Sequence, residues 1–249
     1  MLIEQCAYNN HWRQVPPAAK ALFTACGIVA AFVSRSPLTT CGLAGIMAAV
    51  TLAGAKVPPF RYLKVALPAL LFLAVSAATL AVSVSWGGLP LRLQFQVVGQ
   101  AEIAHIALTC SRSLCGIAAL LFLSLTTSMT DIIALLRRLR FPEVMLDIMT
   151  LGYRTVFVFL EVIHDTRIAQ MARLGYATPR LAMRSLGILT ANLAIQVWQR
   201  SNALHQAASA RNNDGPLIFL EGEYHRPIRS LITATVSGCA LIALALVTI

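Results

Sequence analysis

Charged residues are scarce in this sequence of 249 residues. Asp, Glu, Lys and Arg together make up only 12% of the chain, whereas hydrophobic residues make up 57%. An ordinary soluble domain carries about twice that share of charge. The charges also lie in clusters, and the mean hydropathy of the whole chain is +0.72. This scarcity excludes an ordinary soluble domain and predicts an integral membrane protein.

Motifs for catalysis and cofactor binding are also missing. None of the three lysines, Lys20, Lys56 and Lys64, follows a glycine, so the sequence has no phosphate-binding P-loop. The five histidines show no His-x-x-x-His spacing, and the six cysteines form no Cys-x-x-Cys pair. We therefore expect no catalytic residue, no metal site, no disulfide and no cofactor bound by this chain.

The net charge of +10 raises the question of a nucleic-acid partner. The basic residues lie beside hydrophobic segments, however, and no aromatic and basic reading surface accompanies them. The excess of Lys and Arg in the cytoplasmic loops of membrane proteins explains them better. We therefore expect membrane lipid around the chain and no nucleic acid.

Long apolar segments of the sequence meet the length of roughly 20 residues that a membrane-spanning helix needs. They predict five spans, at residues 18–34, 37–55, 65–85, 103–127 and 230–248. Residues 86–100 contain Trp86, Gly87, Gly88 and Pro90, which predicts a loop with an interfacial aromatic residue. The fold class is all-α, a polytopic membrane protein with about five transmembrane helices.

The distribution of Lys and Arg predicts the orientation of the chain. With a cytoplasmic N-terminus, the inside receives seventeen of these residues and the outside receives only Arg35 and Arg92. The short loops agree with this bias, which places the N-terminus inside and the C-terminus outside.

The segment after the fourth span is rich in charge. Residues 128–229 hold 12 of the 20 basic residues and 8 of the 10 acidic ones. We therefore divide the chain into transmembrane helices at 1–127, a cytoplasmic region of long helices at 128–228 and a last transmembrane helix at 229–249. A transmembrane hairpin through 144–163 and 185–199 is the alternative, but it would place the charged stretch between them outside.

Three helices are predicted within this region. The first begins after the capping residues Thr130-Asp131 and ends before Pro142. The second starts at Pro142 and runs to about Leu174, where Gly175 stops it. The third starts at Thr178-Pro179 and runs to about Arg211, where the helix-ending run Asn212-Asn213-Asp214-Gly215-Pro216 stops it.

The two long helices end in similar sequences. One ends in Ala172-Arg173-Leu174 and the other in Ala210-Arg211-Asn212, so the two arginines lie 38 positions apart. Either arginine alone is explained by the helix dipole, which favours a cation at the C-terminus by about 0.3–1 kcal/mol. As a pair on two long helices, they suggest two equivalent docking points, because a guanidinium binds carboxylates bidentately.

One charge, Arg112, falls inside the fourth apolar span. Charge at such a position is costly and is often functional. A structural role, in which the side chain snorkels or faces a partner, is the interpretation that we favour here.

These features resemble the T component of energy-coupling factor (ECF) transporters, and most closely its cobalt-transport branch, CbiQ. The paired Ala-Arg-x motifs carry the resemblance at one end of the chain, with the second motif inside the run Gln199–Arg211. At the other end, Ile3–Tyr8, Arg13 and Pro17–Lys20 look like the N-terminal segment of that family. The family motif commonly reads Ala-Arg-Gly, so Leu174 and Asn212 depart from it, as does Glu4, where Asp is usual.

The resemblance implies a non-catalytic coupling subunit of an importer for cobalt or nickel ions in a prokaryotic cell membrane. Its partners would be CbiO-like ATPases, which use ATP and Mg²⁺, and CbiM- and CbiN-like membrane subunits, which capture the ion. The ATPase contacts would be Ala172, Arg173, Leu174, Ala210, Arg211 and Asn212. The alternatives are a T component that serves vitamin-binding subunits and, as a different class, a stand-alone membrane enzyme or channel.

Overall fold

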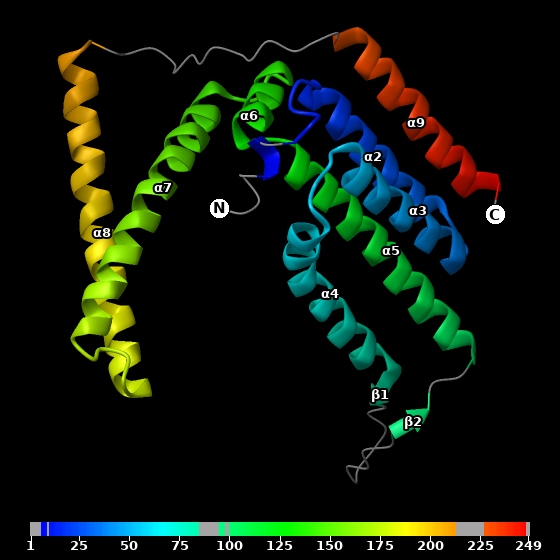
Figure 1. The fold of residues 1–249 in the computed structure, drawn as a ribbon, viewed down its shortest axis with the longest axis horizontal. Coiled ribbons are helices and arrows are strands. Elements are labelled where there is room, and N and C mark those ends of the chain that lie inside the picture. The colour runs from blue at the N-terminus through cyan, green and yellow to red at the C-terminus, as the bar shows by residue number, and fades with distance from the viewer. Residues whose placement is uncertain (1–5, 9, 85–94, 98–99, 213–226, 248–249) are drawn as a thin grey trace. The chain divides into compact units, whose positions relative to one another are not determined.

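The computed structural model describes residues 6–8, 10–84, 95–97, 100–212 and 227–247 (Figure 1). Its chain forms two compact units, Met1–Leu135 with Glu221–Ile249, and Leu136–Leu220. The elements, in chain order, are α2 (Pro17–Val33), α3 (Pro37–Ala49), the π-helical turn η1 (Val50–Gly54), α4 (Pro59–Ala81), β1 (Val82–Val84), β2 (Phe95–Val97), α5 (Gln100–Thr126), α6 (Met129–Arg138), α7 (Glu143–Ala172), α8 (Pro179–Ala210) and α9 (Pro227–Val247).

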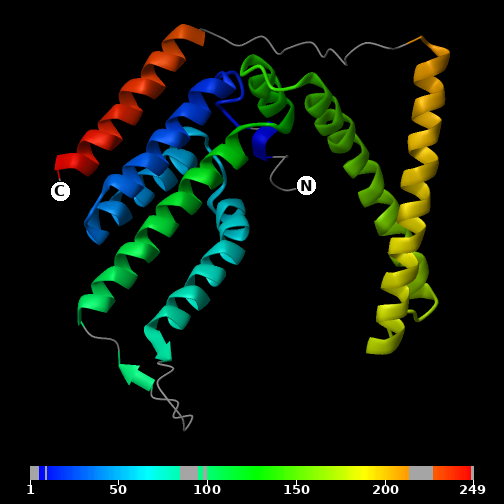
Figure 2. The same ribbon diagram turned by 180° about the vertical axis from the view of Figure 1, so that it is seen from behind.

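Each of the five predicted spans falls on a helix of the first unit. Four stretches are long and apolar enough to cross a membrane: Pro37–Gly54, Pro59–Leu80, Ala104–Thr126 and Ile228–Leu246. The first predicted span, 18–34, coincides with α2, an apolar helix of 17 residues that is blue in Figure 2. The predicted class, an all-α polytopic membrane protein, is confirmed. Among the described helices, α7 and α8, where the alternative hairpin would lie, do not qualify as spans.

The prediction was wrong at both ends of the third span. Helix α4 begins at Pro59 rather than 65, since proline suits the first helical turn and its missing N–H needs no partner there. It ends at Ala81, after which β1 pairs antiparallel with β2, with Ser83 opposite Gln96. The expected loop 86–100 therefore contains a short strand, whereas Trp86, Gly87, Gly88 and Pro90 lie outside the described residues.

The core of the first unit is built from small side chains around one aromatic cluster. The buried residues of this core are Phe23, Ala30, Ala31, Leu43, Ala44, Met47, Cys115, Ala118, Ala119, Phe122, Leu241 and Ala245. Phe122 packs edge-on against Phe23, with ring centroids 5.3 Å apart, and against Trp12, at 6.0 Å. Small residues let membrane helices approach closely, so dispersion contacts hold α2, α3, α5 and α9 together.

Helices α2 and α5 lie antiparallel, and each supplies a cation to the C-terminal end of the other. From α5, Arg112 donates through Nη2 to the carbonyl oxygens of Phe32, at 3.2 Å, and Ser34, at 2.9 Å. From α2, Lys20 donates through Nζ to the carbonyl oxygen of Thr126 at 2.7 Å. The last carbonyls of a helix have no partner within it, and the helix dipole favours positive charge there.

This arrangement explains the charge inside the fourth span. Arg112 binds the backbone at the C-terminal end of α2, which supports the structural interpretation. The chain thus uses an intramembrane arginine to satisfy carbonyl oxygens that would otherwise be costly to bury.

The close approach of α2 and α9 generates a prediction about stability. A Cβ built on Gly238 would lie 2.8 Å from both Cβ and Sγ of Cys26, whereas one on Gly116 would meet nothing within 4 Å. We expect Gly238→Ala to destabilise the purified protein by about 1–3 kcal/mol, because the two helices must separate. The matched control Gly116→Ala should be neutral or stabilising, by up to about 1 kcal/mol. Thermal unfolding in detergent measures both, and equal stability of the two variants would contradict this packing.

Candidate functional site

The three predicted helices of the charged region are present, with corrected ends for the first. Its N-cap is Ser128, whose Oγ accepts a hydrogen bond from the backbone N of Asp131 at 3.3 Å, so α6 starts earlier than Thr130-Asp131 predicted. It stops at Arg138, before Pro142, because Arg140 takes a left-handed conformation with φ of 58°. The Phe141 N–H then donates to the Leu136 carbonyl at 3.2 Å.

Helix α7 ends at Ala172, inside the first predicted motif. Arg173 follows as the C-cap, and Leu174 adopts the left-handed conformation with φ of 55°. This turn lets the Leu174 N–H donate to the Met171 carbonyl at 3.0 Å, and the Gly175 N–H to the Gln170 carbonyl at 2.9 Å. The left-handed residue that ends the helix is therefore Leu174, and the prediction that gave this role to Gly175 was wrong.

Helix α8 ends in the same way inside the second motif. Ala210 is its last residue, Arg211 is the C-cap, and Asn212 is left-handed with φ of 49°. The Asn212 N–H donates to the Ser209 carbonyl at 3.1 Å. Asn213, which the sequence also suggested as a helix-ending residue, lies outside the described residues.

The two arginines share one backbone geometry. Arg173 has φ and ψ of −94° and 16°, and Arg211 has −100° and 7°. Each backbone N–H donates to the carbonyl three residues earlier, at 3.2 Å and 3.1 Å respectively. The motif is therefore duplicated in structure as well as in sequence.

The arginine side chains are free to meet a partner. Both residues are exposed, as are Ala172, Leu174, Ala210 and Asn212. Within the described part of the chain, neither guanidinium has a hydrogen-bond or ion-pair partner. Because the turn backbone already satisfies carbonyls at each helix end, the guanidinium groups keep all their donors for another molecule.

Polar contacts between α7 and α8 brace the first of these helix ends. Gln170 Nε2 donates to the Ser185 carbonyl at 3.0 Å, and the Tyr176 hydroxyl donates to Gln170 Oε1 at 2.7 Å. Ser185 Oγ donates to the Gly175 carbonyl at 2.8 Å. A Cβ at Gly175 would lie 2.7 Å from this Ser185 oxygen, so the close contact requires glycine.

The second end lies at the far terminus of α8. This helix has 32 residues, which corresponds to a length of about 48 Å. Its N-terminus follows the α7 turn directly, so the two motifs lie near opposite ends of one rod (Figure 1). Such a separation suits two binding places on a partner rather than one.

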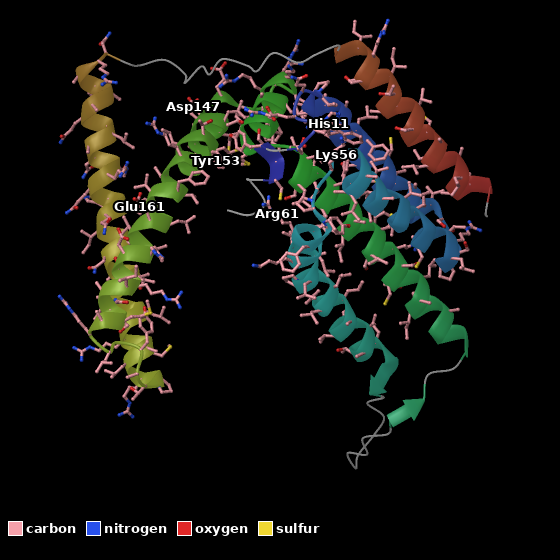
Figure 3. The ribbon with its side chains drawn as sticks, viewed as in Figure 1. His11, Lys56, Arg61, Asp147, Tyr153 and Glu161 are labelled. Atoms are coloured by element: carbon pink, nitrogen blue, oxygen red, sulfur yellow. The ribbon has the colours of Figure 1, made fainter. Side chains whose placement is uncertain are left out.

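The charges of the two helices differ. Helix α8 contains Arg180, Arg184 and Arg200 and no acidic residue, whereas α7 carries acidic side chains that include Asp147 and Glu161 (Figure 3). The two arginine ends and the surface of α8 thus offer positive charge, which complements an acidic surface on a partner.

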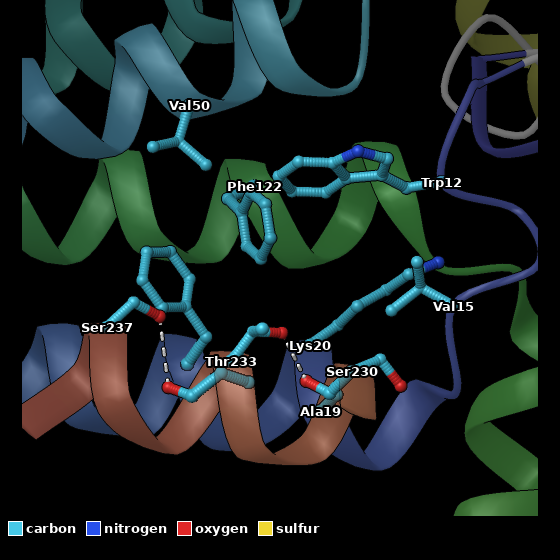
Figure 4. Close-up of a pocket in the computed structure, with 11 residues that line it drawn as sticks. Trp12, Val15, Ala19, Lys20, Val50, Phe122, Ser230, Thr233 and Ser237 are labelled. Carbon is cyan, nitrogen blue, oxygen red and sulfur yellow. Dashed lines mark hydrogen bonds between the residues drawn. The ribbon is translucent and has the colours of Figure 1, made fainter. Parts of the chain in front are cut away.

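A cavity of about 430 Å³ in the first unit is the other candidate site (Figure 4). Its lining consists of Trp12, Val15, Ala19, Lys20, Phe23, Val50, Phe122, Ser230, Thr233, Ala234 and Ser237. The α9 hydroxyls bond to their own helix, Thr233 to the Ser230 carbonyl at 2.9 Å and Ser237 to the Ala234 carbonyl at 3.1 Å. Across the described residues, no three His, Cys, Asp or Glu side chains gather to hold a metal ion.

Comparisons with known proteins show which sequences this chain is similar to. The family model of CbiQ, described as cobalt transport protein, matches residues 9–219. The cobalt transport protein CbiQ of Rhodobacter capsulatus is 34% identical over 88% of this chain and 86% of its own length. A putative fused cobalt transport protein CbiMQ of Methanocorpusculum labreanum is 30% identical over 90% of this chain, which spans only 38% of that longer protein. An uncharacterized protein of Methanocaldococcus jannaschii is 28% identical over 99% of this chain and 93% of its own length.

The left-handed Leu174 generates a prediction. Left-handed backbone costs an L-residue about 1–2 kcal/mol, and glycine avoids this cost. Leu174 is 72% exposed, so its removal forfeits little packing. We expect Leu174→Gly to stabilise the protein by up to about 1 kcal/mol, after the greater chain entropy of glycine is subtracted. The control Leu174→Ile should be destabilising, since β-branched residues fit this conformation poorly. Thermal unfolding measures the stability of both variants. If Leu174→Gly were less stable than Leu174→Ile, the left-handed conformation at this position would not carry the cost described here.

Proposed function

Because this chain belongs to the CbiQ family of cobalt transport proteins, we propose that it is the transmembrane coupling subunit of an ATP-driven importer. In this role the chain catalyses no reaction itself. ATP hydrolysis belongs to CbiO-like partner subunits, and capture of the metal ion belongs to CbiM- and CbiN-like membrane subunits.

The duplicated helix end is the observation that carries the proposal. Arg173 and Arg211 have matching backbone geometry, are exposed, and lie near opposite ends of α8. An ATPase pair offers two equivalent surfaces, and one arginine end for each accounts for the duplication. Each motif is a helix end that enters a groove, a common mode of recognition, and its guanidinium would bind carboxylates at the bottom.

Helix stiffness supplies the mechanism. Nucleotide-driven movement of the ATPase pair would shift the two arginine ends together, and α7 and α8 would carry that displacement to the membrane helices as rigid rods. The polar contacts among Gln170, Gly175, Tyr176 and Ser185 keep the α7 end from slipping along α8 during this stroke. The membrane helices would then reorient the subunit that holds the ion.

The names of the relatives favour cobalt as the transported ion. Two of them are described as cobalt transport proteins, and in one the CbiM and CbiQ parts form a single fused chain. Fusion supports a CbiM-like subunit as the membrane neighbour of this chain. Nickel has closely similar ligand preferences, so the proposal covers both ions.

Charge reversal at the two arginines tests the proposal. In the complete complex, we expect Arg173→Glu or Arg211→Glu to reduce ATPase co-purification and Co²⁺ uptake at least tenfold, and the double variant to abolish both. A buried charge pair that becomes two like charges costs several kcal/mol, which accounts for this size of effect. Quantified co-purification and uptake of radioactive Co²⁺ into cells are the measurements.

The control is Arg154→Glu, which makes the same charge change at an exposed position within α7. It should leave co-purification and uptake within twofold of the wild type. Wild-type behaviour of the Arg173→Glu, Arg211→Glu double variant would remove the docking mechanism.

The proposal also requires both helix ends on the cytoplasmic side. In a chain whose six native cysteines are replaced by alanine, we expect Ala172→Cys and Ala210→Cys to react with a membrane-impermeant maleimide in inside-out vesicles. The same reagent should leave both positions unlabelled in right-side-out vesicles. Labelling from the outside would place the arginines beyond the reach of any cytoplasmic ATPase.

A further inference from the structure

We propose that Lys20 and Asn10 are positioning residues that fix the angle at the joint between α5 and α6. A rigid joint would let motion of the coupling helices α7 and α8 reach the membrane helices. This inference rests on the proposed function and assigns to it a site distant from the two arginine motifs. The joint is defined by residues 126–131, where α5 ends and α6 begins, together with Lys20 and Asn10.

The joint is short and buried. Only Thr127 and Ser128 separate the end of α5 from the start of α6. Thr126, Thr127 and Ser128 are 1%, 4% and 6% exposed. The chain continues directly from one helix into the other, so these residues are the covalent link through which a displacement of α6 reaches α5.

Two side chains from the N-terminal part of the chain bind the end of α5. Lys20 Nζ donates to the Thr126 carbonyl at 2.7 Å, and Asn10 Nδ2 donates to the same oxygen at 3.0 Å. Asn10 also donates to the carbonyls of Ala7, at 3.0 Å, and Leu125, at 3.4 Å. One carbonyl oxygen thus joins α5, α2 and the N-terminal segment.

Charges alternate through the joint. The C-terminal end of α5 carries partial negative charge and faces the Lys20 ammonium, whereas the N-terminal end of α6 carries partial positive charge. Asp131 lies in the first turn of α6, accepts a hydrogen bond from Ser128 Oγ at 2.7 Å and attracts Lys20 electrostatically. Lys20 therefore stabilises the end of one helix and the start of the next at the same time.

The joint also carries polar groups that stability alone does not explain. Among the described residues, the buried side-chain atoms without a hydrogen-bond partner are Asn10 Oδ1, Thr127 Oγ1 and Arg112 Nε. Two of these three atoms lie at the joint, and each costs free energy in a buried site. Lys20 is itself only 3% exposed. An apolar contact would hold the helices together at lower cost, but it would let them slide, whereas directional bonds fix their angle.

The experiment compares transport with hydrolysis in the complete complex, reconstituted in liposomes. For Lys20→Met, we expect ATP hydrolysis within twofold of the wild type and Co²⁺ taken up per ATP hydrolysed to fall at least tenfold. Lys20→Arg keeps the cation and the donors, and should restore the ratio to within threefold of the wild type.

Arg112→Met is the matched control, because Arg112 also caps a helix end in the same α2–α5 pair but lies away from α6. It should lower the yield of folded complex while leaving the uptake per ATP unchanged. A merely structural role for Lys20 would give Lys20→Met this same signature.

The outcomes are separable. A wild-type complex that hydrolyses ATP without importing Co²⁺ would overturn the proposed function and this inference together. Two outcomes would overturn the inference alone. In the first, the wild type imports Co²⁺ and Lys20→Met takes up the same amount of Co²⁺ per ATP hydrolysed. In the second, Arg112→Met loses as much uptake per ATP as Lys20→Met does. If Lys20→Met does not assemble, Asn10→Ala provides the test instead. We expect the Co²⁺ taken up per ATP hydrolysed to fall about threefold in Asn10→Ala. A value equal to that of the wild type would contradict the proposal.

Discussion

The last carbonyl oxygens of a helix have no partners within that helix, and this constraint shapes both units of the chain. In the first unit, cations from neighbouring helices satisfy these oxygens: Arg112 for α2, and Lys20 with Asn10 for α5. In the second unit, left-handed residues turn the backbone so that it satisfies the oxygens itself. The two solutions have opposite consequences for the charged side chains nearby.

Where side chains cap the helix, the cations bind backbone carbonyl oxygens of the protein itself. Lys20 is buried, and two carbonyl oxygens hold the Nη2 group of Arg112. Where the backbone caps the helix, Arg173 and Arg211 stay exposed. The left-handed Leu174 and Asn212 therefore leave the two arginines free for the proposed docking. The left-handed conformation costs leucine more free energy than it costs asparagine. The two helix ends therefore adopt the same backbone geometry with different residues.

The proposed coupling role requires stiffness along one path through the chain. The path runs from the arginine ends through α7 and α8, then along the chain through α6 into α5. Polar side chains fix it at two places, the α7–α8 contact at Gln170 and Ser185 and the joint at Thr126. Hydrogen bonds are directional, so they resist changes of angle that apolar packing tolerates.

The sequence by itself determined the membrane class, the five apolar helices, the three helices of the charged region and the paired Ala-Arg-x motifs. These follow from local features, namely hydrophobic length, proline and capping residues, and clustering of charge. It failed at the start of α4, at the short strands and in giving the helix-ending role to Gly175 rather than Leu174. Only the tertiary structure decided which distant groups Arg112, Lys20 and Asn10 bind, since these are backbone oxygens 78 to 116 residues away. A carbonyl oxygen is the same in every residue, so no side-chain pattern in the sequence marks which one a distant cation will reach.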